Sequence, residues 1–167
     1  MNEHFEDVLS ANAEFARSYS SGHLQGRAAR GLAIVTCMDS RIDPLAMLGL
    51  AKGDAKILRN AGARVTSDVL RTLVLAAHLL GVDRVMIVAH TDCRMTKVTN
   101  DDIYAAIAES SGLDTRSLDF GVISDQRAVL ASDVQRVRSS PYLPVHMPVL
   151  GCVYDLATGL LDVLITE

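Results

Sequence analysis

Two apolar runs in this chain each end at residues that bind soft metal ions. Residues 32–36 form the first run and are followed by Cys37, and residues 85–89 form the second and are followed by His90 and then Cys93. Short apolar runs of this kind are typical of buried parallel strands. Open α/β sheets keep their binding sites at the carboxyl ends of the strands. We therefore expect the two cysteines and the histidine to lie close together if these strands are neighbours.

Two thiols and one imidazole form a ligand set that zinc prefers. A catalytic zinc site uses three protein ligands and leaves a fourth position open. Cys37, His90 and Cys93 supply the three ligands, and we predict one zinc ion per chain. Either cysteine taken alone is better explained as a small buried hydrophobic residue, so the prediction depends on all three residues together. Cys152 has no ligand-type neighbour, and we expect it to be such a buried residue.

Asp39 and Arg41 follow Cys37 at steps of two. Residues two apart in an extended segment point to the same side, so we expect a thiolate, a carboxylate and a guanidinium on one face. Arg41 can hold Asp39 in a bidentate ion pair and keep that carboxylate off the metal. If Asp39 were instead a fourth ligand, the zinc site would be closed and structural, and the residues alone leave this alternative open. We expect Asp92 to be a solvated loop carboxylate or a group that supports the ligands.

The combined pattern resembles the β-class carbonic anhydrases. It consists of C-x-D-x-R at residues 37–41, R-N-A-G at residues 59–62 and H-x-x-C at residues 90–93. The resemblance extends from the N-terminal helix to the last strand. It implies a zinc lyase that reversibly hydrates carbon dioxide to bicarbonate by a zinc-bound hydroxide. In this scheme Asp39 accepts a hydrogen bond from the hydroxide, and Arg41 orients Asp39.

The sequence departs from the family pattern beside the predicted site. Arg94 follows Cys93 where the family commonly has glycine, so a long cation lies at the rim of the site. We assign Ala61, Gly62 and Arg94 as candidate substrate-binding residues. Members of the same broad family hydrolyse carbonyl sulfide or carbon disulfide with the same zinc ligands. The motif therefore leaves three functions open, namely carbon dioxide hydration, which we favour, hydrolysis of these sulfur compounds, and a non-catalytic structural zinc.

Strand-like and helix-like segments alternate along the chain. We expect strands at residues 31–37, 55–58, 84–89, 149–156 and 160–165, and helices at residues 2–19, 43–50, 69–80, 100–110 and 124–138. This alternation predicts an α/β fold with a mostly parallel central sheet and flanking helices. With strands numbered along the chain, the expected order is 2-1-3-4, because the first and third strands must bring the ligands together. A Gly-containing turn makes the last strand antiparallel.

Length and composition limit the remaining possibilities. A chain of 167 residues with 49% hydrophobic content fits a single domain spanning residues 1–167. The net charge of −4 gives no reason to expect nucleic acid or a membrane as a partner. Three cysteines are an odd number, and the N-terminus lacks the features of a secretory signal. These features predict reduced thiols and a cytoplasmic protein.

The N-terminal helix forms an arm at residues 1–20 with apolar residues at helical spacing. A polar loop follows it, so the helix has nothing nearby in sequence on which to pack. In the resembled family this helix reaches across a dimer. We therefore expect self-association as a homodimer or tetramer, with packing on its own domain as the alternative.

Overall fold

The computed structural model describes residues 3–20, 22 and 24–166, and a five-stranded sheet lies at its centre. The strands are β1 (Leu32–Cys37), β2 (Ala55–Asn60), β3 (Arg84–His90), β4 (Val149–Tyr154) and β5 (Leu161–Ile165). Their order across the sheet is β2-β1-β3-β4-β5, and every neighbouring pair is parallel except β4 and β5. The predicted order and the antiparallel last strand are confirmed.

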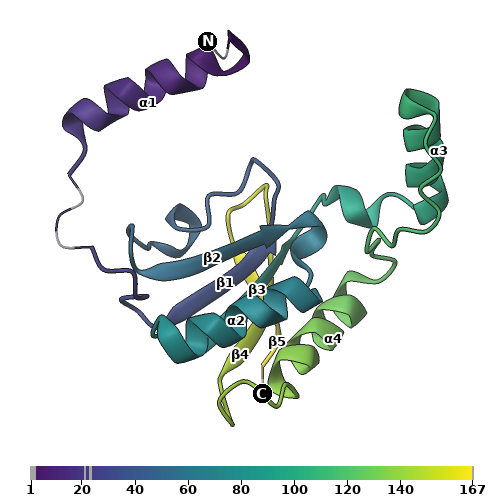
Figure 1. Cartoon of the computed structure of the whole chain (residues 1–167). Coiled ribbons are helices and arrows are strands. Elements are labelled where there is room, and N and C mark those ends of the chain that lie inside the picture. The colour runs from purple at the N-terminus through teal and green to yellow at the C-terminus, as the bar shows by residue number, and fades with distance from the viewer. Residues whose placement is uncertain (1–2, 21, 23, 167) are drawn as a thin grey trace.

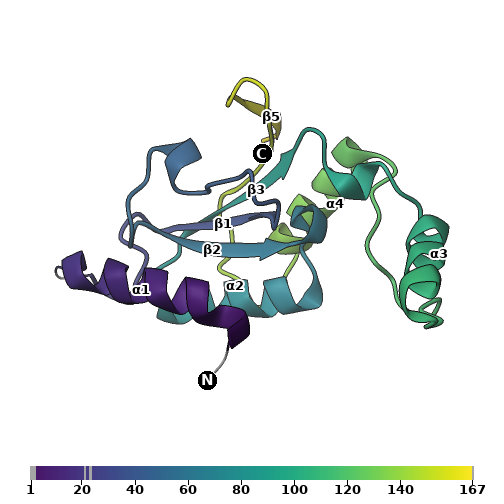
Figure 2. The ribbon, with the colours of Figure 1, turned by 90° about the horizontal axis from the view of Figure 1, so that it is seen from above.

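Helices flank this sheet unevenly. The α-helices of the described part of the chain are α1 (Glu6–Ser18), α2 (Ser67–Leu79), α3 (Asn100–Ser111) and α4 (Gln126–Arg138), and the 3-10 helices are η1 (Glu3–Phe5), η2 (Ala46–Leu48), η3 (Ala61–Ala63) and η4 (Arg94–Thr96). Figures 1 and 2 show α2 and α4 on one face of the sheet, whereas α1 and α3 extend away from it in different directions. No helix among the described residues has the length and apolar character that crossing a membrane requires.

The helix predicted at residues 43–50 is wrong, because only Ala46–Leu48 is helical, as a 3-10 turn. Asp43 accepts hydrogen bonds from N–H groups at the start of this turn, as a helix cap would. Gly49 then takes a left-handed conformation, with φ of 62°, and ends the turn. Leu48 at the end of this turn and Leu50 after it pack against the buried cluster of Ile34, Val88 and Cys152.

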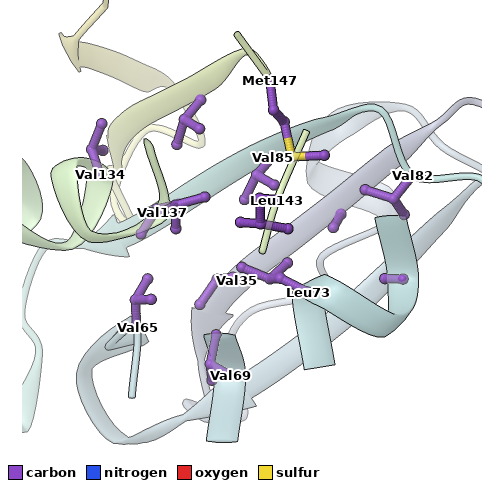
Figure 3. Close-up of a cluster of buried hydrophobic side chains, with 14 of the residues drawn as sticks. Val35, Val65, Val69, Leu73, Val82, Val85, Val134, Val137, Leu143 and Met147 are labelled. Atoms are coloured by element: carbon purple, nitrogen blue, oxygen red, sulfur yellow. The ribbon is translucent and has the colours of Figure 1, made fainter. Parts of the chain in front are cut away.

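The main hydrophobic core lies between the sheet and the two helices α2 and α4 (Figure 3). It includes Val35 and Val85 from the strands, Val69 and Leu73 from α2, and Val134 and Val137 from α4. Alternate strand residues face the other side, where Ile34, Val88 and Cys152 form a smaller buried cluster. The β1 and β3 runs are almost entirely apolar because both of their faces are covered, and the buried hydroxyl of Thr36 in β1 donates to the carbonyl oxygen of Val88 at 2.9 Å. The predicted burial of Cys152 is confirmed.

The apolar face of α1 is not covered within the chain. None of its described residues is buried. Its large apolar side chains Val8, Leu9 and Phe15 remain about half exposed. A contact with the rest of the domain comes from Lys52, whose ammonium lies 4.4 Å from the ring centre of Tyr19. Met1 and Asn2 of the predicted arm lie outside the described residues.

Apolar residues occupy more than one side of α2, but within one chain only one side is buried. Val69, Leu73 and Ala76 face the core. Leu75 and Leu79 on another side are exposed. The second apolar side of α2 is therefore available for contact with another molecule.

Candidate metal centre

Cys37, His90 and Cys93 converge at the carboxyl ends of two adjacent strands. Cys37 is the last residue of β1 and His90 the last residue of β3. The two strands are parallel neighbours, so their carboxyl ends meet at one edge of the sheet. The two sulfur atoms and a ring nitrogen of His90 all lie within 4.8 Å of one another, and the group could hold a metal ion. The structure thus brings the three predicted ligands together.

The imidazole of His90 is oriented as a metal ligand. Its Nδ1 lies 2.8 Å from the carbonyl oxygen of Thr91 and therefore carries the donated proton. Its Nε2 keeps a free lone pair and, within the described part of the chain, is buried without a hydrogen-bond partner. A buried polar atom left unsatisfied is costly, and a cation between this nitrogen and the two thiols would satisfy it. The donor set and the supported imidazole both fit zinc.

Backbone N–H groups support both sulfur atoms. The N–H of Gly62 donates to Cys37 Sγ at 3.4 Å, and the N–H of Met95 donates to the thiol of Cys93. Burial raises the pKa of Cys93 to about 11, and the Met95 N–H opposes that rise. A bound cation overrides the effect of burial, because a coordinated thiol is deprotonated. The two N–H groups therefore stabilise the thiolates that a metal requires.

Gly62 is required both by its backbone conformation and by its close packing. Its φ is 78°, and an added Cβ would lie 2.9 Å from Ile123 Cδ1 and 3.4 Å from Met95. We expect Gly62→Ala to lower the free energy of unfolding of the metal-free protein by about 2–4 kcal/mol, from left-handed strain and overpacking together. Urea unfolding measures this loss.

Gly112 is a matched control for this substitution. Its φ is 73°, and an added Cβ would meet nothing within 4 Å. Gly112→Ala should therefore lose only about 1–2 kcal/mol, the cost of the backbone conformation. Equal losses in the two variants would contradict the close packing around Gly62.

Arg41 holds the carboxylate of Asp39 beside the ligands. Its Nε and Nη2 donate to the two carboxylate oxygens at 2.9 and 2.7 Å, and its backbone N–H donates at 3.0 Å. These hydrogen bonds hold the pKa of Asp39 well below its usual range. Oδ2 of Asp39 lies 3.9 Å from Nε2 of His90. An ionised carboxylate therefore lies next to the candidate metal position with both of its oxygens bound by Arg41.

This pair has a different origin from the one that the sequence suggested. β1 ends at Cys37, and residues 39–42 form a turn instead of an extended segment, closed by a hydrogen bond from the N–H of Ile42 to the carbonyl oxygen of Asp39 at 3.1 Å. Asp39 accepts the N–H two residues further on, which is the Asx-turn arrangement. Asp114 and Arg116 make the same three hydrogen bonds far from the ligands. A D-x-R sequence in a turn is therefore sufficient to form such a pair.

Two more residues support the ligand loops, and sequence analysis did not assign these contacts. Arg59 donates to the carbonyl oxygens of Cys37 and Asp39 at 2.9 and 2.6 Å. Asp92 accepts a hydrogen bond from Nη1 of Arg41 at 2.8 Å. Hydrogen bonds from Arg41 and then Lys97 lower the pKa of Asp92 to about 2. These contacts make Asp92 a partner of Arg41 and Lys97 beside the candidate ligands, and not only a solvated loop carboxylate.

The three candidate substrate-binding residues have different surroundings. Ala61 lines a cavity of about 380 Å³ beside the start of α2. Gly62 is buried, and its N–H is already used at the metal centre. Arg94 is exposed in η4 near Asp102, whose pKa is lowered first by hydrogen bonds from Thr99 and to a lesser extent by the charge of Arg94. Substrate contact by these residues stays a prediction.

Comparison with known proteins agrees with this geometry. Residues 32–161 match the family model described as carbonic anhydrase. The chain is 36% identical over 160 residues to β-carbonic anhydrase 1 of Mycobacterium tuberculosis, covering 94% of this chain and 95% of the relative. A crystal structure of carbonic anhydrase from Streptococcus mutans superposes with a TM-score of 0.90 at 34% identity, covering 97% of this chain and 98% of that chain. The chain therefore belongs to the β-carbonic anhydrase family.

A sulfur-compound hydrolase is also among the relatives. The carbon disulfide hydrolase of Acidithiobacillus thiooxidans is 30% identical over 149 residues, covering 78% of this chain and 75% of the relative. This match is lower in identity and shorter in coverage than the match to the mycobacterial carbonic anhydrase.

Proposed function

We propose that this protein catalyses the reversible hydration of carbon dioxide to bicarbonate at one zinc ion bound by Cys37, His90 and Cys93. The observation that carries the proposal is the buried, unpartnered Nε2 of His90 within 4.8 Å of two thiols, in the part of the chain that the structure describes. An ionised carboxylate beside this group adds the second element of the site. Membership of the β-carbonic anhydrase family supports this reaction.

The residues around the ligands have separable roles. When bound, zinc lowers the pKa of water and supplies hydroxide near neutral pH. Asp39 accepts a hydrogen bond from this nucleophile and orients it toward the carbon atom of carbon dioxide. Because an ionised carboxylate is only an acceptor and its low pKa disfavours protonation, Asp39 does not store the proton that hydration releases. Arg41 fixes the position of Asp39.

A closed structural zinc site is less consistent with this geometry. In such a site Asp39 would be the fourth ligand. Both of its oxygens are instead bound by Arg41 through a bidentate pair at 2.7 and 2.9 Å. The pair is also held beside the candidate ligands by the contact of Arg41 with Asp92, which the equivalent pair of Asp114 and Arg116 lacks among the described residues.

Hydrolysis of carbonyl sulfide or carbon disulfide is the second candidate, and the relatives named carbon disulfide hydrolase favour it. A stopped-flow assay of the zinc-loaded protein with carbon dioxide and carbonyl sulfide in parallel separates the two. We expect rapid proton release with carbon dioxide and slow release of sulfide. Sulfide release much faster than carbon dioxide hydration would replace the first proposal by the second.

We also propose that the protein self-associates through the uncovered apolar faces of α1 and α2. No described residue of α1 is buried, although Val8, Leu9 and Phe15 are large and apolar. On α2, Leu70 and Leu75 line an apolar groove of about 540 Å³. Two such faces in one chain are complementary in a homodimer or tetramer.

The buried, reduced cysteines are consistent with a cytoplasmic location.

Deletion of residues 1–20 should reduce the oligomer to monomers or make the protein aggregate, because the apolar surface on the partner would lose its cover. Sedimentation velocity at micromolar concentration measures this change. Glu14→Ala is the control, since Glu14 is exposed on α1 and pairs only with Arg17 of the same helix within the described residues. A truncated protein that is soluble and keeps the native oligomeric mass would contradict the proposal.

A further inference from the structure

The guanidinium of Arg41 is held from two sides. Asp39 accepts hydrogen bonds from Nε and Nη2 at 2.9 and 2.7 Å. On the other side, Asp92 accepts from Nη1 at 2.8 Å with its carboxylate and from Nη2 at 3.3 Å with its carbonyl oxygen. An arginine has five N–H donors, and these contacts use four different ones. Asp39 and Asp92 therefore accept from different N–H groups of Arg41 and do not compete for it.

Asp92 is itself fixed in place. It lies between the candidate ligands His90 and Cys93, so their positions restrict its backbone. Its φ of 58° is left-handed, a conformation that aspartate, asparagine and glycine tolerate. Its second carboxylate oxygen is bound by the ammonium of Lys97. The carboxylate thus bridges two cations, one at each oxygen.

The Asp114 and Arg116 pair shows what this arrangement adds. It repeats the local hydrogen bonds of Asp39 and Arg41, but Arg116 has no second carboxylate among the described residues. Its arginine side chain is 76% exposed, compared with 50% for Arg41. A D-x-R turn alone therefore leaves the arginine in solvent. The contact with Asp92 is what attaches Arg41 to the loop that carries Cys93.

We infer that Asp92 is a positioning residue that fixes Arg41 and thereby keeps the carboxylate of Asp39 off the metal. The inference rests on the proposed zinc site. Oδ2 of Asp39 lies only 3.9 Å from Nε2 of His90, so a small displacement of the Arg41 and Asp39 pair brings this oxygen into the metal's fourth position. Without the carboxylate of Asp92, Arg41 keeps its local partner, and only the 3.3 Å hydrogen bond to the carbonyl oxygen of residue 92 still joins it to the ligand loop. Asp39 then competes with external ligands for the metal.

The test compares Asp92→Gly with Asp92→Asn in cobalt-substituted protein, with azide as the probe and visible absorption as the readout. Both glycine and asparagine tolerate the left-handed backbone. Glycine removes the carboxylate that accepts from Nη1 of Arg41, whereas asparagine keeps a side-chain acceptor oxygen without the charge. We expect azide to bind Asp92→Gly roughly tenfold more weakly than wild type, the low end of the value of a charge-assisted hydrogen bond. Asp92→Asn should stay within about threefold of wild type, because the hydrogen bond remains. Asp114→Gly is the matched control and should bind azide as wild type does.

Three results would overturn the inference. Wild-type azide affinity in Asp92→Gly would show that Asp39 does not depend on Asp92. Equal weakening in Asp92→Gly and Asp92→Asn would assign the effect to charge and not to the hydrogen bond. Loss of cobalt from Asp92→Gly would make Asp92 a support of the ligands themselves. Azide binding needs no turnover, so the role of Asp92 can be tested independently of the proposed reaction. A wild-type protein that binds azide but does not hydrate carbon dioxide would refute the proposed function, and the azide affinities of the variants would still decide the role of Asp92.

Discussion

We expect Cys93→Ser to lose its zinc and its carbon dioxide hydration together. Loss of a group that merely supports a ligand weakens metal binding by about 10–100-fold, and loss of a thiolate ligand should cost more. The wild type should hold about one zinc ion per chain, bound by three protein ligands. In Cys93→Ser the zinc content should fall to nearly none after dialysis. The thermal midpoint should fall as well, because the ligands join separate elements of the fold and metal binding is coupled to folding. Metal analysis and thermal unfolding measure the two effects.

Cys152→Ser is the matched control for this variant. Cys152 is fully buried in the cluster with Ile34 and Val88. Its thiol is 3.7 Å from the carbonyl oxygen of Ile87, to which a serine hydroxyl can also donate. Its zinc content and turnover should remain those of the wild type. Full zinc stoichiometry in Cys93→Ser would show that the assigned ligand set is wrong.

Arg41→Ala should retain zinc and lose turnover by about 10–100-fold, the range for removing an outer partner of a metal site. Arg41 holds the pKa of Asp39 low, and without it that pKa rises toward its ordinary value of about 3.9. Asp39 therefore stays ionised from about pH 6.5 to 9 in both proteins. As the pH falls, hydroxide becomes scarcer while the carboxylate of Asp39, freed from Arg41, remains charged and competes for the metal. The loss of turnover should therefore be greatest at low pH. Metal analysis and stopped-flow rates across this range test the prediction.

Two other variants separate the causes of this loss. Asp39→Ala should also retain zinc, but its activity should fail at every pH because the nucleophile has lost its acceptor. Arg116→Ala removes the equivalent arginine of the Asp114 pair and should behave as wild type. An Arg41→Ala protein with wild-type turnover and pH profile would remove the main reason for preferring a catalytic zinc to a structural one.

The sheet could be predicted from the sequence because its signals are local and strong. Apolar runs bounded by turn residues predicted all five strands, and the requirement that Cys37 meet His90 predicted the strand order. The segment at residues 43–50 was predicted wrongly because a helix cap at Asp43 is a local signal that Gly49, six positions later, cancels. The exposed side of α2 was also not predictable, since periodicity shows which residues are apolar and not what covers them.

The convergence of the three candidate ligands was predictable from the sequence, and the contacts around them were less so. Thiols and an imidazole at strand ends indicate a metal through chemistry that the residue names carry. The contact between Asp92 and Arg41 joins residues 51 positions apart, and no local pattern indicates it. The N–H groups that reach the two sulfur atoms belong to the backbone, which residue type does not reveal. A partial signal was Gly62, since glycine beside a predicted site often marks a close approach of the backbone.

The assigned zinc site can be observed in a crystal structure of the zinc-loaded protein, with anomalous scattering measured at the zinc edge. The crystals should be kept at a pH of about 8.5, above the pKa of about 7 for zinc-bound water. We expect one zinc ion, bonded to Sγ of Cys37, Sγ of Cys93 and Nε2 of His90. Asp39 should be bonded to Arg41, and the fourth position should hold a solvent oxygen. A zinc ion bonded to Asp39 at that pH, or a zinc ion at other residues, would contradict it.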